Sequence, residues 1–309
     1  MMSVRTAGIT SACVVAALIA TGCAPRGYVS DYAGSRPPAQ TDAAATPQPS
    51  RKTGRPTGGS RSLAATLESS DGRLAAALLQ LLGVPNAVTH RQVAREYRRL
   101  RVLDKAHEHF SSAVRLDPTD AESFEALARI WRDWGTPHLG LGDAYRAVYH
   151  APRSAAAANT LGTLLHAMKR IEDAKAWYAR AILLEPTASY ALNNLCYTEV
   201  MSGGQLAIET CHRAVAAAPG TKAAQNNLAL AYTAAGERDI AKKWFRRANE
   251  QPSIAAYNYG IAMMAARSYK EATSAFQEAL QADPRFTLAA HRANQARNAL
   301  AKDQNRVDD

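Results

Sequence analysis

Asparagine side chains recur at one place in a repeating pattern, and they are the residues best suited to chemistry in this sequence. The candidates are Asn159, Asn193, Asn194, Asn226, Asn227 and Asn258. Asparagine is a mediocre helix former, so its recurrence needs a reason. Its amide carries both a donor and an acceptor and can pair with the backbone of an extended peptide. The pattern predicts a peptide-binding surface, and the alternative is that these amides bond neighbouring repeats and stabilise their stacking.

Other patterns that carry chemistry are weak. His107 and His109 are two residues apart, which places them on different sides of a helix, so they do not make a zinc pair. The remaining histidines are scattered: His90, His138, His150, His166, His212 and His291. No nucleophile elbow, phosphate-binding loop or Cys-x-x-Cys motif is present. We therefore expect neither an enzyme nor a metal or cofactor site.

The elements that position the asparagines follow from a second pattern. Six prolines, spaced by 34, 34, 33, 33 and 32 residues, punctuate the chain: Pro118, Pro152, Pro186, Pro219, Pro252 and Pro284. Two antiparallel helices need small residues where they cross, such as Gly162 and Ala174, and a large one between them, such as Tyr178. Proline then ends the second helix, because it lacks an N–H and clashes with the preceding turn.

This combination resembles the tetratricopeptide repeat (TPR), a pair of antiparallel helices in 34 residues. Six units are expected, at residues 87–120, 121–154, 155–188, 189–221, 222–252 and 253–286. A single helix pair cannot bury its apolar faces, so such units stack. The predicted fold is an all-α TPR α-solenoid, with an apolar N-terminal helix in 62–86 and a capping helix and polar tail in 287–309.

The resemblance also implies roles for particular residues. TPR arrays have a concave groove lined by the first helix of each pair, and the asparagines resemble the ladders of peptide-binding members. The lysine, arginine and asparagine set that clamps a free C-terminal carboxylate is missing from consecutive units. Cys196 and Cys211 fall at positions that face each other between two helices of one repeat. In an oxidising compartment a disulfide there is expected, and the alternative is two buried thiols.

The N-terminus predicts export. Residues 1–22 have a basic start, Arg5, and a short apolar segment typical of a signal peptide. The segment ends at Cys23 in a sequence that resembles a bacterial lipobox, which implies that Cys23 is lipidated; an ordinary signal peptide with an incidental cysteine is the alternative. Ala24 follows instead of aspartate, which implies the periplasmic face of the outer membrane in a Gram-negative cell. Residues 23–61 are rich in Pro, Gly, Ser and Thr and predict a disordered basic tether.

Charge and apolar residues suggest further partners. The net charge of +10 favours anionic envelope polymers over nucleic acid for an exported protein. Four basic residues on one predicted second helix form either solvated surface or a contact for such polymers: Lys242, Lys243, Arg246 and Arg247. The apolar segment from Leu74 to Leu82 is expected to pack on the first repeat, and it is also the candidate surface for a homodimer.

Together these features resemble the TPR lipoproteins that assist type IV or Tad pilus assembly, or that act as adaptors for cell-wall enzymes and proteases. We expect a membrane-anchored scaffold that binds a peptide segment of another cell-envelope protein in its groove, in pilus or secretion-system assembly. The alternative is a structural spacer, or a regulator of cell-wall enzymes or proteases, that binds cell-wall polymer or a partner through its basic surface.

Overall fold

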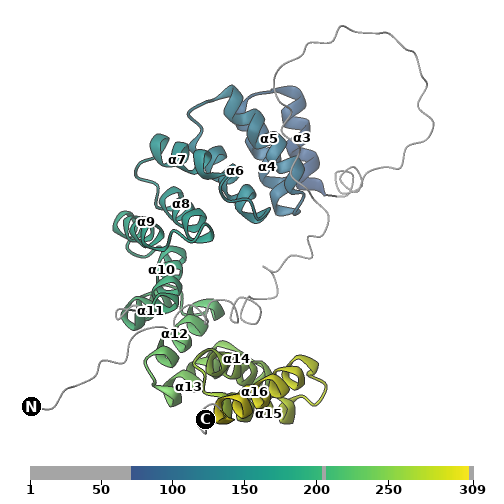
Figure 1. Cartoon of the computed structure of the whole chain (residues 1–309). Helices are drawn as coiled ribbons and strands as arrows, with labels where there is room; N and C mark the ends of the chain where they lie inside the picture. The colour runs from purple at the N-terminus through teal and green to yellow at the C-terminus, as the bar shows by residue number, and fades with distance from the viewer. Residues whose placement is uncertain (1–70, 204–206, 306–309) are drawn as a thin grey trace, which may run out of the picture. The chain divides into compact units, whose positions relative to one another are not determined.

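The structure is a computed structural model that describes residues 71–203 and 207–305; these residues form 14 α-helices and no strand (Figure 1). They divide into two compact units, which meet in sequence between Met168 and Lys169. The predicted signal peptide, Cys23 and the tether lie outside the described residues. Within the described ranges, no helix combines the length and apolar character needed to cross a membrane.

The first unit contains six helices: α3 (Gly72–Gly83), α4 (Ala87–Arg99), α5 (Leu103–Leu116), α6 (Ala121–Asp133), α7 (Leu141–His150) and α8 (Ala155–Ala167). Helix α4 packs against α3 and α5, and α6 packs against α5, α7 and α8. Leu74, Val93, Tyr97, Phe110 and Ile130 are almost completely buried between these helices. Each helix therefore buries one apolar stripe against its neighbours, as stacked helix pairs require.

The second unit contains eight helices: α9 (Ile171–Leu184), α10 (Ser189–Met201), α11 (Ala207–Ala217), α12 (Lys222–Ala234), α13 (Arg238–Ala248), α14 (Pro252–Ala265), α15 (Tyr269–Ala282) and α16 (Thr287–Asn305). Helices α10, α12 and α14, each the first of its pair, lie next to one another. Phe245, Ile261 and Phe276 fill the core, and α16 packs against α15. The predicted all-α fold of paired helices is confirmed.

Most of the periodic prolines follow a helix end directly. Asp117, Glu185 and Asp283 are C-cap residues with extended backbone, and each precedes a proline that excludes the helical conformation. Pro252 was predicted to close the fifth repeat, but it occupies the first turn of α14 instead. Proline is tolerated there, since the N–H that it lacks has no partner within the helix.

The turn inside each helix pair uses the left-handed backbone region. Six residues at equivalent places have positive φ: Arg101 (64°), Gly135 (76°), Lys169 (64°), Gly203 (72°), Gly236 (82°) and Arg267 (58°). A residue with a Cβ adopts this region at a cost of roughly 1 kcal/mol, whereas glycine does not. Three of the six turns therefore use a strained basic residue where the other three use glycine.

Close helix packing depends on a glycine in the last pair. A Cβ built on Gly260 would lie 2.6 Å from the ring of Phe276 on α15, which is nearer than packed atoms approach. The absent side chain of Gly260 thus makes the space that the Phe276 ring fills. In the pair of α10 and α11, the two equivalent positions carry Cys196 and Cys211.

Helix α3 packs on the first pair, as expected. Asp71 caps it by accepting from the backbone N–H groups of Arg73 and Leu74, and Leu74 is buried. Leu79 and Leu82 instead point to solvent, with 69% and 81% of their surface exposed. This exposed apolar edge keeps the prediction of a homodimer open, and nothing in the structure tests it.

Candidate peptide-binding surface

Two predicted asparagines join successive repeats. The Nδ2 group of Asn227 on α12 donates a hydrogen bond of 2.9 Å to the Oδ1 atom of Asn193 on α10. Both side chains are half-buried. The bond uses only the donor of Asn227 and only the acceptor of Asn193, so the Oδ1 of Asn227 and the Nδ2 of Asn193 lie outside it. The pair therefore bonds two successive repeats, and it still carries one acceptor and one donor outside that bond.

A second asparagine pair, Asn226 and Asn258, is linked through a residue that the sequence pattern missed. Asn249, the C-cap of α13, donates from Nδ2 to Oδ1 of Asn226 at 3.2 Å and to the carbonyl of Phe245 at 2.8 Å. Its Oδ1 accepts from Nδ2 of Asn258 at 3.5 Å. Asn258 itself is buried. Asn249 lies in the connection between repeats, where no periodic signal marks it.

The remaining asparagines lie apart from these links. Asn194 is half-buried on α10, and its carbonyl accepts a 2.7 Å hydrogen bond from the hydroxyl of Thr198. Asn159 is half-buried on α8 and belongs to the compact unit formed by α3 to α8. The structure thus brings together Asn193 with Asn227 and Asn226 with Asn258, whereas a role of any of the six in binding stays a prediction.

Cys196 and Cys211 form a disulfide between α10 and α11. Their Cα atoms are 4.9 Å apart, within the range that a disulfide spans, and both residues are fully buried. The bond occupies the positions of the glycine and aromatic ring that pack together in the last helix pair, and it joins α10 covalently to α11. Two cysteines have less volume than the glycine and phenylalanine of the last pair, and the disulfide joins them covalently instead.

Two histidines that appeared scattered in the sequence meet in the first helix pair. The Nδ1 atoms of His90 on α4 and His109 on α5 are 3.0 Å apart, because the two helices run antiparallel and adjacent. The Nδ1–H group of one ring donates a hydrogen bond to the Nδ1 atom of the other. Burial lowers the pKa of His90, and the charge of Arg115 adds to this effect. His107 instead contacts the rings of Trp131 and Trp134.

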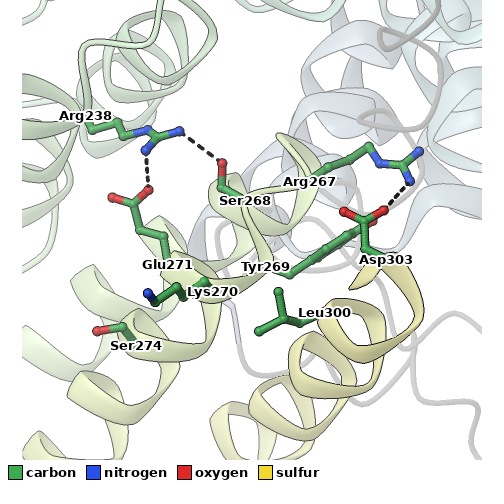
Figure 2. A pocket seen from close by; sticks show the side chains of 9 residues that line it. All are labelled: Arg238, Arg267, Ser268, Tyr269, Lys270, Glu271, Ser274, Leu300 and Asp303. Atoms are coloured by element: carbon green, nitrogen blue, oxygen red, sulfur yellow. Dashed lines mark hydrogen bonds and ion pairs between the residues drawn. The ribbon is translucent and has the colours of Figure 1, made fainter. Parts of the chain in front are cut away.

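A pocket of about 540 Å³, lined by several charged residues, lies between the ends of α13, α15 and α16 (Figure 2). Arg238 pairs with Glu271 at 3.0 Å and donates to the Ser268 hydroxyl at 3.2 Å, and Arg267 pairs with Asp303 at 3.5 Å. Both arginines are therefore already neutralised. Glu271 also accepts from the Tyr259 hydroxyl at 2.6 Å; burial and then this bond raise the pKa of Tyr259.

Comparisons with known proteins identify the architecture. The sequence model of the tetratricopeptide repeat matches residues 155–187, which lie within the third predicted unit. The chain is a TPR solenoid. No curated protein matches it by sequence.

Solved TPR structures share this fold at low identity. The Cut9–Hcn1 hetero-tetramer of the APC/C is 18% identical with a TM-score of 0.59, over 76% of this chain and 48% of that one. PilW, described as a widely conserved type IV pilus biogenesis factor, is 22% identical with a TM-score of 0.56, over 65% and 94%. PilF of Pseudomonas aeruginosa is 17% identical with a TM-score of 0.55, over 69% and 96%. These similarities establish the fold alone.

The basic patch of the TPR solenoid is partly neutralised. Lys242 and Arg246 on α13 both pair with Glu278 on α15, at 2.7 and 3.0 Å. Arg247 lies over the ring of Trp244 at 5.1 Å. The patch is thus weaker as a polymer-binding surface than its sequence indicates. In the described ranges, no group of three or more His, Cys, Asp and Glu side chains could hold a metal ion.

Proposed function

We propose that this TPR solenoid is a lipid-anchored scaffold of the cell envelope, at the periplasmic face of the outer membrane in a Gram-negative cell. It binds an extended segment of another envelope protein along the first helices of its repeats, in pilus or secretion-system assembly. PilW, which shares this fold, is described as a type IV pilus biogenesis factor, and this supports the pilus context. The sequence resemblance to TPR lipoproteins supports the anchor.

The observation that carries the binding proposal is the amide pair of Asn193 and Asn227. An extended backbone offers one donor and one acceptor to such a surface. The Nδ2 of Asn193 and the Oδ1 of Asn227 match that demand, because the bond between the two residues uses the other group of each amide. The inter-repeat bond holds both amides in place, which lowers the entropy lost when a peptide binds.

One substitution separates binding from stacking. Asn193→Asp keeps an acceptor for Asn227 and replaces the Nδ2 donor by a second acceptor. We expect the full chain, tagged and purified in detergent, to retain an envelope protein from solubilised membranes. Asn193→Asp should lose this protein, although its urea unfolding midpoint should match that of the native chain. Asn294→Asp on α16 is the charge-matched control, since its oxygen would still accept from Arg297. Equal retention by all three proteins would contradict peptide binding at the amide pair.

The anchor has its own test. Cells fed labelled palmitate should label the native chain and a Cys13→Ala variant, and Cys23→Ala should carry no label and leave the membrane fraction. A native chain that stays unlabelled, or a Cys23→Ala variant that remains labelled, would refute lipidation at this cysteine.

A further inference from the structure

Five arginines gather on the first helices of the two N-terminal repeats, and we call them the arginine surface: Arg91, Arg95 and Arg98 on α4, and Arg129 and Arg132 on α6. The three on α4 are spaced i, i+4 and i+7, so they project from one stripe of the helix. Arg91 and Arg95 reach Glu122 at the start of α6, which shows that the stripe faces the neighbouring first helix.

Four of the five arginines have a carboxylate partner. Arg91 pairs with the buried Asp120 at 2.7 Å, and the Nε of Arg95 donates to Glu122 at 2.7 Å. On α6, Arg132 pairs with the adjacent Asp133 at 2.7 Å.

The partner of Arg129 is the most loosely held. Its Nη1 atom is 3.4 Å from Oε1 of Glu125, and the same oxygen accepts a 2.8 Å hydrogen bond from the Thr160 hydroxyl on α8. A carboxylate shared in this way neutralises Arg129 less completely than a bidentate pair would. Arg129 is also 41% exposed, so an external carboxylate can reach it.

Arg98 is the fifth arginine, and it pairs with no carboxylate in the part of the chain that the structure describes. Its guanidinium lies 5.9 Å from the centre of the Phe110 ring, and it makes no ion pair or side-chain hydrogen bond with any residue in ranges 71–203 and 207–305. It is half-buried. Burial lowers its pKa and the charge of Arg129 adds to this effect, whereas the charges of Glu125 and Glu122 oppose it. A partly desolvated cation without a directly paired carboxylate is stabilised when an anion joins it.

We propose that the arginine surface binds an acidic side chain of the partner segment, with its carboxylate held by Arg98 and Arg129. Guanidinium groups bind carboxylates bidentately and lose little solvation in doing so, which makes arginine well suited to this task. The ligand is an internal Asp or Glu, because the sequence lacks the set that clamps a free C-terminus. This inference rests on the proposed function and names the chemistry of the segment that is bound.

The test measures binding of a fluorescent octaglutamate peptide, capped at both ends, to the full chain in detergent by anisotropy. The capped octaglutamine peptide is the neutral comparison. We expect Arg98→Gln to weaken octaglutamate binding by about tenfold, the loss typical of a charged hydrogen bond. Arg146→Gln on α7 is the matched control, since that arginine is 64% exposed and outside the arginine surface. The affinity of this variant for octaglutamate should differ from that of the native chain by less than about twofold.

Stability separates a binding role from a structural one. Arg98→Gln should unfold at the same or higher urea concentration than the native chain, because it removes an unpaired charge and breaks no ion pair. Equal binding of both peptides, or equal affinities of Arg98→Gln and Arg146→Gln, would overturn the proposal. If the full chain captures an envelope protein that Arg98→Gln captures equally well, the acidic-segment proposal fails while the scaffold proposal stands. Tight octaglutamate binding that requires Arg98, without any captured envelope protein, would support the acidic-segment proposal and contradict the scaffold proposal.

Discussion

Asn227 donates a 2.9 Å hydrogen bond to Asn193 and thereby connects the first helices of two successive repeats through their side chains. The two residues are 34 positions apart, so the bond exists only when the repeats stack. A double-mutant cycle with Asn193→Ala and Asn227→Ala should give a coupling free energy of about 1 kcal/mol in urea unfolding. Repeating the cycle with Asn226→Ala in place of Asn227→Ala is the control, since the amide of Asn226 bonds Asn249 instead. A coupling near zero for the bonded pair would show that this bond does not stabilise stacking.

The disulfide should contribute more to stability than any single hydrogen bond. Cys196 and Cys211 are separated by 15 residues, and closing a loop of that size stabilises a fold by about 3 kcal/mol. Reductant should therefore lower the free energy of unfolding of the native chain by about this amount. Unfolding of the double variant Cys196→Ala and Cys211→Ala should not respond to reductant. A native chain that unfolds identically with and without reductant would argue against this contribution.

The left-handed turn residues allow a test with opposite signs. Gly236 has φ of 82° and no atom near the place of a Cβ, so Gly236→Ala isolates backbone strain, and we expect a loss of about 1 kcal/mol. Gly142, in the first turn of α7, also has open space around it but ordinary φ. Gly142→Ala should leave the free energy of unfolding unchanged or raise it, since alanine favours helices. Both are measured by urea unfolding, and equal effects would refute the assignment of strain.

Asp143 should make stability depend on pH. Burial raises its pKa from 3.8 to about 6, and Arg146, 3.8 Å away, opposes this only in part. Because the folded state holds its proton to higher pH than the unfolded state, stability falls as pH rises from about 4 to about 6. Asp143→Asn removes this loss, and it should stabilise the chain at pH 7 by up to about 3 kcal/mol more than at pH 4. An equal difference between variant and native chain at both pH values would contradict the prediction.

Helix positions were predictable from the sequence because their causes are local. Asp71 caps α3 through its own side chain, and Pro186 follows the extended residue that ends α9. Pro252 shows the limit of this logic, since proline is equally compatible with the first turn of a helix. A periodic proline therefore marks a boundary between helices without saying on which side it lies.

The candidate sites were predictable only in part. The spacing of asparagines correctly placed Asn193 and Asn227 on successive first helices, but Asn249 lies outside the periodic positions and links Asn226 to Asn258. Arg91, Arg95 and Arg98 have a spacing that places them on one helical stripe, but no prediction was drawn from it. The missing carboxylate partner of Arg98 among the described residues was not predictable from the sequence. Asp120, Glu122 and Glu125 pair with other arginines only once the helices have packed.

The sequence by itself determined the repeat and the paired helices, since the conformation of each turn depends on residues within a few positions of it. It also determined that Cys196 and Cys211 lie on the two helices of one pair. The tertiary structure decided which side chains meet: Asn193 with Asn227, His90 with His109, and Arg98 with the Phe110 ring. These outcomes depend on the packing distance and rotation between helices, and a difference of a few ångströms there separates a hydrogen bond from none.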